Sequence, residues 1–255
     1  MSSQRHPAEA RAAEIWPVGA PPRVAARLRA APDGPVRVLH RTPQASYVEV
    51  GGRCVGITGP GAVALPVALH ASRALPPLGD ELTARVEGGV LHWGRWALVP
   101  GRLVDVRAPR IDPDRVAATE TVQPLADDLP THVDAASVAR LVGRGEGLTP
   151  LGDDVVCGWL AFHRAARIPT PAVDAAVRLL LARTTTLSAT LLDAALAGEV
   201  CPPVGVYLRA LGSADAADAA EARARLVRVG HTSGAGLAHG VDLAAAEIAR
   251  RRRAA

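Results

Sequence analysis

The sequence predicts an α+β fold in which a small β-rich N-terminal part precedes a helical C-terminal domain. Short apolar runs bounded by Gly-Gly and Pro-Gly pairs fill residues 36–110, a pattern typical of hairpins. After about residue 112 these signals fade, and Ala-rich segments carry the start and stop signals of helices. We therefore expect an N-terminal extension (1–35), a β-rich domain (36–110) and a helical domain (111–255), with the connection near 107–130.

The β-rich part is expected to contain regularly spaced hairpins, which favour a small antiparallel sheet or a partial barrel. The expected strands are Val36–Leu39, Ser46–Val50, Arg53–Ile57, Leu82–Glu87, Val90–Trp93, Trp96–Val99 and Arg102–Val106. Tight turns at Gly51-Gly52, Gly88-Gly89 and Pro100-Gly101 would join three pairs of them. We expect helices at Pro21–Ala31 and Gly59–Ala74, and little regular structure in the rest of residues 1–35.

Seven helices are expected in the C-terminal domain. They are Asp134–Leu141, Thr149–Ala166, Pro171–Ala182, Leu187–Ala197, Val204–Leu211, Ala214–Val229 and Gly234–Arg253. Gly198 and Gly230 are suitable helix stops, because glycine readily adopts the left-handed conformation that ends a helix. Apolar residues make up 49% of the chain but aromatic residues only 3%, so Ala, Val and Leu must fill the core.

The composition excludes several kinds of chemistry. The chain contains no lysine, which rules out a P-loop lysine, a pyridoxal-phosphate Schiff base and a lysine nucleophile. Arginine remains as the cation that could clamp a carboxylate or a phosphate. Cys54, Cys157 and Cys201 are widely spaced and odd in number, which indicates reduced, buried thiols. No signal-peptide pattern opens the chain and no window resembles a membrane span, so we expect a cytoplasmic protein.

The excess positive charge is concentrated at the C-terminal end. The formal net charge is +4 and the sequence pI is about 9.6, with much of the excess in Arg250–Arg253. Such a run can bind nucleic acid, but stacking aromatic residues are scarce and no nucleic-acid motif is present. We favour the simpler interpretation, in which the run complements the dipole of the last helix, and do not expect a nucleic-acid or membrane partner.

The stretch Gly143–Gly158 combines a Gly-rich turn with a helix start. Thr149 is expected to cap the helix and Pro150 to occupy its first position, which would leave backbone N–H groups free to bind an anion. The glycines would let the backbone approach a ligand closely. The residues expected to contact substrate here are Gly145, Gly147, Thr149 and Gly152.

The same stretch carries two adjacent carboxylates, Asp153 and Asp154. They would repel a bare phosphate, so either a cation such as Mg²⁺ intervenes or they accept hydrogen bonds from the N–H groups of a substrate. Adjacent residues of a helix point about 100° apart, so we expect one aspartate to face the ligand and the other to bind backbone or solvent. The alternative is that both merely complement the helix dipole.

Two further segments combine hydroxyl groups with a helix start. In Thr184–Ser188, either Thr186 or Ser188 caps a helix, or their hydroxyls donate to a ligand oxygen. In Gly230–Gly236, His231 is either a proton donor or acceptor or an ordinary loop histidine. The residues expected to contact substrate in this last segment are Thr232, Ser233 and Gly234.

We expect these segments to meet. Every second helix start of an antiparallel bundle lies at the same end, so Gly147–Asp154, Thr185–Ser188 and His231–Gly234 should surround one cavity, with an arginine nearby as counter-charge. The candidate catalytic residues are Asp153, Asp154 and His231.

Taken together, the three segments resemble the AllH-type family. In this chain they are GEGLTPLGDDVVCG at Gly145–Gly158, TTTLSATLLDAALAG at Thr184–Gly198 and GHTSGAGLAHG at Gly230–Gly240. The GLTPxGDD motif is specific, the other two are supporting, and the resemblance covers mainly residues 138–250. The chain has Ala235-Gly236 where the family pattern has a bulkier aromatic-acidic pair.

The resemblance implies a subunit of oxamate carbamoyltransferase, an enzyme of purine (allantoin) breakdown that works with partner subunits. In that reaction carbamoyl phosphate and oxamate interconvert with oxalurate and phosphate. The resemblance implies that the Thr149 helix start holds phosphate or carboxylate and that Asp153 or Asp154 accepts from the carbamoyl NH₂. His231, with the hydroxyls of Thr232 and Ser233, would bind the developing oxyanion. The alternative is a non-catalytic subunit that binds a small anion or serves assembly.

Overall fold

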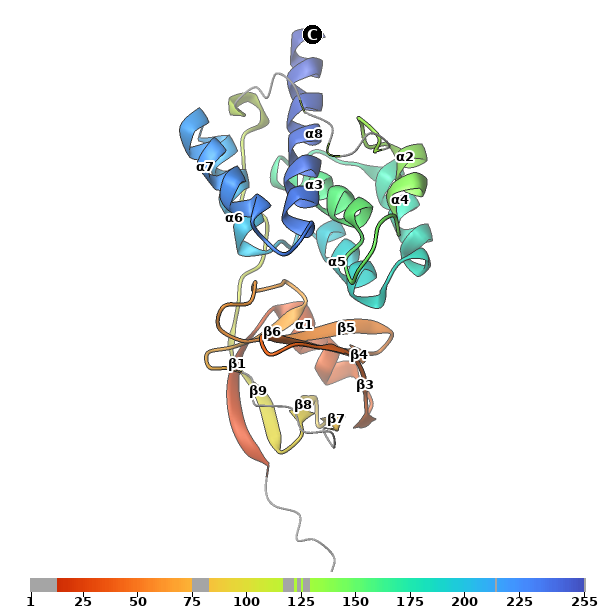
Figure 1. Cartoon of the computed structure of the whole chain (residues 1–255), viewed down its shortest axis with the longest axis vertical. Helices are drawn as coiled ribbons and strands as arrows, with labels where there is room; N and C mark the ends of the chain where they lie inside the picture. The colour runs from red at the N-terminus through yellow and green to blue at the C-terminus, as the bar shows by residue number, and fades with distance from the viewer. Residues whose placement is uncertain are drawn as a thin grey trace, which may run out of the picture.

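The chain folds into a curved β-sheet at one end of the molecule and a group of helices at the other (Figure 1). The computed structural model describes residues 13–74, 83–116, 122, 125, 129–213 and 215–254. Within these residues the sheet part precedes the helical part along the chain. The predicted α+β class is confirmed.

In the described part of the chain, nine strands form one sheet with the order β2-β7-β8-β9-β1-β6-β5-β4-β3. They are β1 (Glu14–Ala20), β2 (Gly34–Pro35), β3 (Arg37–Arg41), β4 (Ala45–Val50), β5 (Arg53–Thr58), β6 (Ala68–Ala71), β7 (Ala84–Glu87), β8 (Val90–Trp93) and β9 (Trp96–Leu103). Most neighbouring strands are antiparallel, but β1 pairs with β9 and β5 with β6 in parallel. The sheet curls into a nearly closed barrel around an apolar cluster that includes Trp16, Leu98 and Leu28, the last from helix α1 (Pro22–Ala30).

Two of the three predicted hairpins are present. Gly51 and Gly52, with φ of 57° and 70°, join β4 to β5, and Gly88 and Gly89, with φ of 57° and 77°, join β7 to β8. Two-residue hairpin turns need positive φ, which explains why both turns are Gly-Gly. Leu82, where we expected the strand of β7 to begin, lies outside the described residues.

The third predicted hairpin, at Pro100-Gly101, is wrong. Strand β9 continues through this pair and lies parallel to β1. The register shifts opposite the pair, because Val18 is aligned with Pro100 and Gly19 with Arg102. Gly101 is thus the extra residue of a bulge, and a bulge is one of the few places in a sheet that tolerates proline.

The N-terminal segment contributes more to the sheet than the sequence predicted. Glu14–Ala20 form β1, which lies between β9 and β6, although we expected little regular structure there. The expected helix at Pro21–Ala31 is present as α1. The expected helix at Gly59–Ala74 is wrong, since this segment is a loop followed by β6. Pro66 disfavours helical backbone at the residue before it. The division of the chain at residues 36 and 111 stays a proposal.

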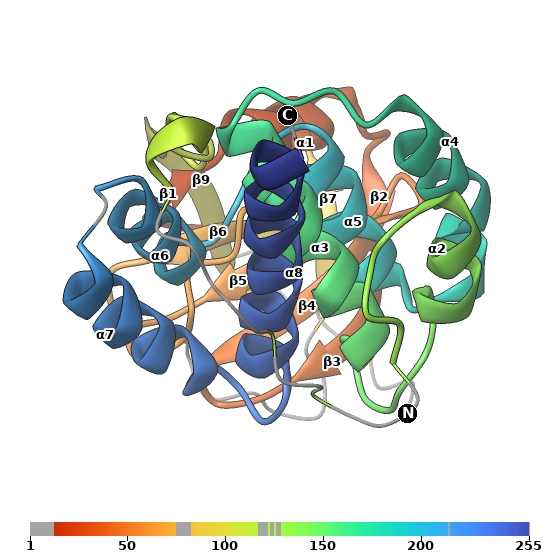
Figure 2. The ribbon, with the colours of Figure 1, turned by 90° about the horizontal axis from the view of Figure 1, so that it is seen from above.

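All seven helices predicted for the C-terminal part are present, with ends within two residues of those expected. They are α2 (Ala135–Leu141), α3 (Leu151–Ala165), α4 (Pro171–Leu180), α5 (Thr186–Leu196), α6 (Pro202–Gly212), α7 (Ala216–Val227) and α8 (Ser233–Ala254). Seen from above, α8 stands in the middle beside α3, with α6 and α7 on one side and α2 and α4 on the other (Figure 2). Gly198 and Gly230 end helices with φ of 76° and 63°, as predicted. None of the described helices is long and apolar enough to span a membrane.

Helices α3 and α8 pack against each other at unusually short range. A Cβ atom added to Gly158 would lie 2.0 Å from the carbonyl oxygen of Leu237, and one added to Gly240 would lie 2.0 Å from that of Val155. Each glycine therefore allows backbone to approach backbone where any side chain would collide. This contact holds the two helix starts of the candidate site together.

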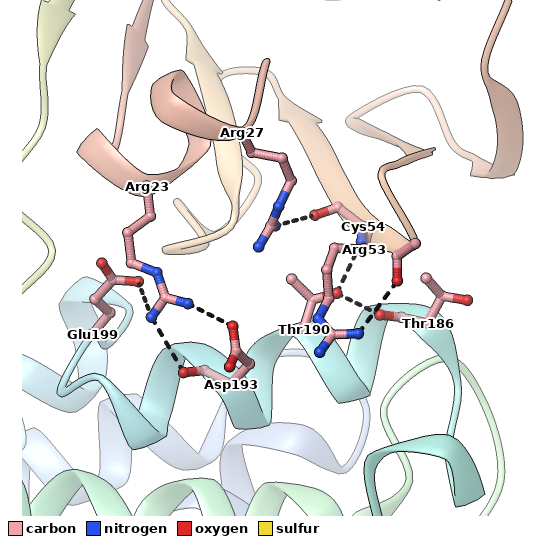
Figure 3. Close-up of polar contacts among 9 residues, drawn as sticks. Arg23, Arg27, Arg53, Cys54, Thr186, Thr190, Asp193 and Glu199 are labelled. Carbon is pink, nitrogen blue, oxygen red and sulfur yellow. Dashed lines mark hydrogen bonds and ion pairs between the residues drawn. The ribbon is translucent and has the colours of Figure 1, made fainter. Parts of the chain in front are cut away.

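Polar contacts join the sheet part to the helical part (Figure 3). Arg23 of α1 donates to the Asp193 carboxylate of α5 at 2.5 Å. The backbone N–H of Cys54 in β5 donates to the hydroxyl of Thr190 in α5 at 2.8 Å. A small apolar cluster, drawn from both parts, lies beside these contacts. The two parts are thus docked through α5.

Replacing Gly240 by alanine is expected to destabilise the protein by about 1–3 kcal/mol or more, because the added methyl group overpacks the contact with α3. The matched control is Gly205→Ala on α6, where the nearest atom to the new methyl would be 3.7 Å away. That change should stabilise the helix by about 0.5–1 kcal/mol. Urea unfolding measures both, and equal stabilities of the two variants would contradict the close packing of α3 on α8.

Candidate functional site

A cavity of about 280 Å³ lies between the helical part and the sheet part. Its wall consists of Tyr47, Ala62, Val63, Leu65, Pro66, Leu148, Thr149, Asp154, Cys157, Ala161, Leu187, Leu191, Ala195, Glu199, Val200, Cys201, Val204, Val229, Gly230, Ser233 and Leu237. Each of the three polar segments contributes to it: Thr149 and Asp154 from the first, Leu187 from the second and Ser233 from the third. The three segments therefore meet at one cavity, although the second contributes an apolar side chain to its wall and no hydroxyl.

The charge of this cavity differs from the prediction. Among the described residues that form its wall there is no arginine or histidine, and the ionisable carboxyl groups are those of Asp154 and Glu199. The expected nearby arginine is Arg23, which lies outside the wall, 3.8 Å from the Glu199 carboxylate. Most of the wall is apolar, so a charged ligand would lose its hydration without gaining an opposite charge.

Asp154 is the polar group that the fold leaves unsatisfied in this cavity. Its side chain is 4% exposed, and its Oδ2 atom has no hydrogen-bond partner within the described part of the chain. The pKa of Asp154 is raised to about 8, mainly by burial and in smaller part by the neighbouring Asp153, while hydrogen bonding with the hydroxyls of Ser233 and Thr149 opposes the shift. Near neutral pH this carboxyl is largely protonated, so it can donate a proton or, once ionised, accept one.

Asp153 has the opposite environment and a structural role. Its side chain is fully buried, at 0% exposure. Oδ1 accepts from the backbone N–H of Gly143 at 2.8 Å, and Oδ2 accepts from the hydroxyls of Ser188, at 2.6 Å, and Thr184. These donors tie the Gly-rich turn and the start of α5 to α3. The expectation that the two aspartates point to different environments is confirmed, and Asp154 is the one that faces the cavity.

The start of α3 is not capped as predicted. Pro150, not Thr149, occupies the cap position, and no side chain caps the helix. The hydroxyl of Thr149 lies 2.7 Å from that of Ser233, so it links the starts of α3 and α8. The N–H groups expected to be free are in use, because Gly152 donates to Arg144 and Asp153 to Pro150. This helix start thus lacks two of the donors on which the predicted anion site depends.

The hydroxyl groups of the second segment serve the fold. Thr185 caps α5, in place of the predicted Thr186 or Ser188, and its hydroxyl also donates to the carbonyl oxygen of Leu148 at 2.5 Å. The carbonyl of Thr186 accepts from the Thr190 hydroxyl, and Ser188 donates to Asp153. Neither Thr186 nor Ser188 is part of the cavity wall.

The third segment is split between wall and solvent. Ser233 lines the cavity, whereas His231 and Thr232 are exposed and lie outside its wall. Gly234 does not contact the cavity either, since it packs against α7: an added Cβ atom would lie 2.0 Å from the carbonyl oxygen of Leu226. A loop that positions Ser233 leaves His231 on the outside of the same turn.

The glycines of the first segment shape the turn before α3. Gly145 and Gly147 have φ of 112° and 87°, a region that favours glycine. An added Cβ atom on Gly145 would lie 2.7 Å from the backbone nitrogen of Leu151, and one on Gly152 would lie 2.1 Å from the carbonyl oxygen of Leu141. Packing accounts for Gly145 and Gly152, and none of the three glycines belongs to the cavity wall.

Sequence reasoning missed several groups of the wall. Cys157 and Cys201 line it as buried free thiols, and burial raises the pKa of Cys201 to about 11. Burial also raises the pKa of Glu199, whose carboxylate lies 3.8 Å from Arg23. Cys157 could have been found, since it follows Asp154 by three residues and so shares its helix face. Glu199 lies in a connection between helices and carried no such signal.

The expectation of Mg²⁺ receives no support from side-chain geometry. Within the described residues, no group of three or more His, Cys, Asp or Glu side chains converges in a way that could hold a metal ion.

The cavity thus combines a buried carboxyl, a pair of hydroxyls and a largely apolar wall. The family model described as oxamate carbamoyltransferase subunit AllH matches residues 141–245, which include α3, α5 and the site half of α8. The matched residues contain all three motifs, so the match agrees with the resemblance that the motifs indicated. No curated protein and no solved structure matches the chain.

Asp153→Asn is expected to destabilise the protein by about 1–3 kcal/mol, because an amide has a single acceptor oxygen for the donors that now bind the carboxylate. Urea unfolding near neutral pH measures the loss. Asp105→Asn is the control, since that side chain is 62% exposed in the connection after β9. A variant at Asp153 as stable as the control would contradict the structural role.

Asp154→Asn, in contrast to Asp153→Asn, is expected to stabilise the protein. The pKa of Asp154 is about 8 in the folded protein, against an ordinary value of 3.8, so the native state is favoured by protonation and loses stability as pH rises from about 4 to about 8. The neutral amide avoids this loss. The free energy of unfolding of the variant should therefore exceed that of wild type. The difference should grow between about pH 4 and about pH 8 and level off above that, at on the order of a few kcal/mol. Urea unfolding at about pH 5.5 and about pH 9 tests this, and a difference independent of pH would contradict the raised pKa.

Proposed function

We propose that this chain is a subunit of a carbamoyltransferase-type enzyme and that its cavity holds the amide that exchanges a carbamoyl group. The family match supports the class of enzyme. The observation that carries the role of the cavity is the Asp154 carboxyl, buried on the wall with Oδ2 unpartnered. We also propose that the protein acts in the cytoplasm and takes part in purine (allantoin) breakdown.

In the proposed reaction, the amide nitrogen of the acceptor attacks the carbamoyl carbon of carbamoyl phosphate. A C–N bond forms and the C–O bond to phosphate breaks, with the electron pair leaving on phosphate. Ionised Asp154 takes the proton that the amide nitrogen loses. In the reverse direction phosphate attacks the carbamoylated amide, and Asp154 returns the proton to the departing nitrogen. A pKa near 8 suits both directions near neutral pH. With oxamate as acceptor the product is oxalurate.

The hydroxyl pair of Thr149 and Ser233 is proposed to bind the carbonyl oxygen of the reacting amide. The two oxygens lie 2.7 Å apart and both residues line the cavity beside Asp154. One hydroxyl donates to the other, so the pair has one O–H left for the ligand. A donor aimed at a developing negative charge in an apolar site stabilises it strongly. The resemblance implied this role for His231, Thr232 and Ser233. The proposal keeps Ser233 and adds Thr149, because His231 and Thr232 are exposed.

Phosphate binding is proposed to need a partner subunit. The described wall carries carboxyl groups and no cation, and a phosphate dianion is held in proteins by arginine, lysine, a metal or free backbone N–H groups. At the start of α3 the N–H groups of Gly152 and Asp153 are occupied. We therefore place the phosphate-binding cations on partner subunits of the complex.

Asp154→Asn should lower the rate of carbamoyl transfer by about 100-fold or more, because the variant can neither take nor return the proton. The assay uses the complex that co-purifies with the chain from its native host, with carbamoyl phosphate and either oxamate or another small amide. The wild-type rate of carbamoylation should rise with pH up to about 8, where Asp154 becomes ionised. The control Asp105→Asn should keep the wild-type rate.

The same assay distinguishes the proposed enzyme subunit from a non-catalytic one. Binding of a small anion to the complex, without turnover of any amide and without an effect of Asp154→Asn, would support a non-catalytic subunit and contradict the proposed reaction.

A further inference from the structure

The wall of the cavity limits the charge that its ligand can carry. Asp154 and Glu199 are the ionisable carboxyl groups on the wall, and no cationic side chain accompanies them among the described lining residues. Asp154 is largely protonated near neutral pH and Glu199 is paired with Arg23, so neither offers a charge to a ligand. A carboxylate placed here would lose its hydration without meeting a free cation on the described wall, whereas a neutral ligand avoids this penalty. The cavity therefore favours an uncharged ligand over an anionic one.

The unpartnered oxygen of Asp154 specifies the polar group of that ligand. If Asp154 is protonated on Oδ2, this atom needs an acceptor, and if it is ionised, Oδ2 needs a donor. A primary amide carries a carbonyl acceptor and two N–H donors, so it satisfies Oδ2 in either state. The Thr149–Ser233 hydroxyl pair lies beside it for the remaining polar atom of the amide.

The rest of the wall specifies an apolar substituent. Val63 and Leu65 come from the sheet part, Leu187 and Leu191 from α5, and Val204 from α6. The volume of about 280 Å³ lies just below the ~300–1,000 Å³ of most ligand pockets. The cavity thus has room for an acceptor that is larger and less polar than oxamate.

We infer that the cavity selects an uncharged primary amide with a short apolar substituent, and that it discriminates against the oxamate carboxylate. The identity of the amide as the reacting group rests on the proposed carbamoyl transfer. The amide end lies against Asp154 and the Thr149–Ser233 pair, and the substituent lies among the aliphatic side chains of α5, α6 and the loop before β6.

Binding is tested on the full chain near neutral pH by ligand-observed NMR or calorimetry, with butyramide, butyrate and oxamate as probes. Butyramide and butyrate share an apolar chain and differ in the polar end, so they isolate the effect of charge. Butyramide should bind at least about tenfold more tightly than either anion. Equal or tighter binding of oxamate, or no binding of butyramide, would overturn the inference.

Three variants locate the bound amide. Asp154→Asn keeps a donor and an acceptor at this position, so butyramide binding should persist, whereas Asp154→Leu should abolish it. Val63→Arg adds a cation to the wall, and it should raise the affinity for oxamate and butyrate relative to butyramide. The control Asp105→Asn should bind the probes like wild type. Unchanged preference in Val63→Arg, together with unchanged butyramide binding in Asp154→Leu, would place the ligand elsewhere and overturn the inference.

The test of ligand selectivity can fail or succeed independently of the test of carbamoyl transfer. Carbamoyl transfer to oxamate by the native complex, with no binding of butyramide to the chain, would leave the proposed function standing and overturn this inference. Binding of butyramide in preference to oxamate, with no transfer to any amide, would support the ligand class and contradict the proposed reaction.

Discussion

The candidate site depends on the close approach of α3 and α8. The two helices touch backbone to backbone at Gly158 and Gly240, where a Cβ atom would lie 2.0 Å from a carbonyl oxygen of the other helix. At the end nearer the site, a Cβ atom on Gly236 would lie 2.8 Å from the Cβ of Asp154. This approach brings the start of α8 against the start of α3, so the Ser233 and Thr149 hydroxyls meet at 2.7 Å. At the ~8–10 Å spacing of ordinary helix pairs the hydroxyls would separate.

The two adjacent aspartates show how the fold divides buried charge. Asp153 is stabilised by a backbone N–H and two hydroxyls, and it joins the Gly-rich turn, α3 and the start of α5. Asp154 is equally deep but its Oδ2 has no partner in the described structure. Leaving a buried carboxyl unpaired costs stability, and such groups gather at functional sites. The fold therefore satisfies one carboxyl completely and leaves the other beside the cavity.

Local patterns in the sequence were sufficient for the helices and the Gly-Gly hairpins, because caps, stops and positive-φ turns are specified by neighbouring residues. Strand β1 and the continuation of β9 through Pro100-Gly101 were not predicted, because the parallel pairing of these two strands is a long-range contact. The meeting of the three polar segments could be predicted from helix order. The sequence could not predict which of their side chains face the cavity. Leu187 and Ser188 are neighbours in the chain, yet Leu187 lines the cavity while Ser188 donates to Asp153.

The sheet part had no place in the predicted site, yet it closes one side of the cavity through Tyr47, Val63 and Leu65. Its docking on α5, through Arg23 and Asp193, places these side chains opposite the helical part of the wall. The burial that raises the pKa of Asp154 would also disfavour the binding of a phosphate dianion in the cavity. One wall cannot suit both a protonated acid with a neutral amide and a doubly charged leaving group. If carbamoyl transfer occurs here, the charged half of the reaction must therefore be stabilised by cations that the cavity wall lacks, which gives a physical reason for the enzyme to be built from subunits.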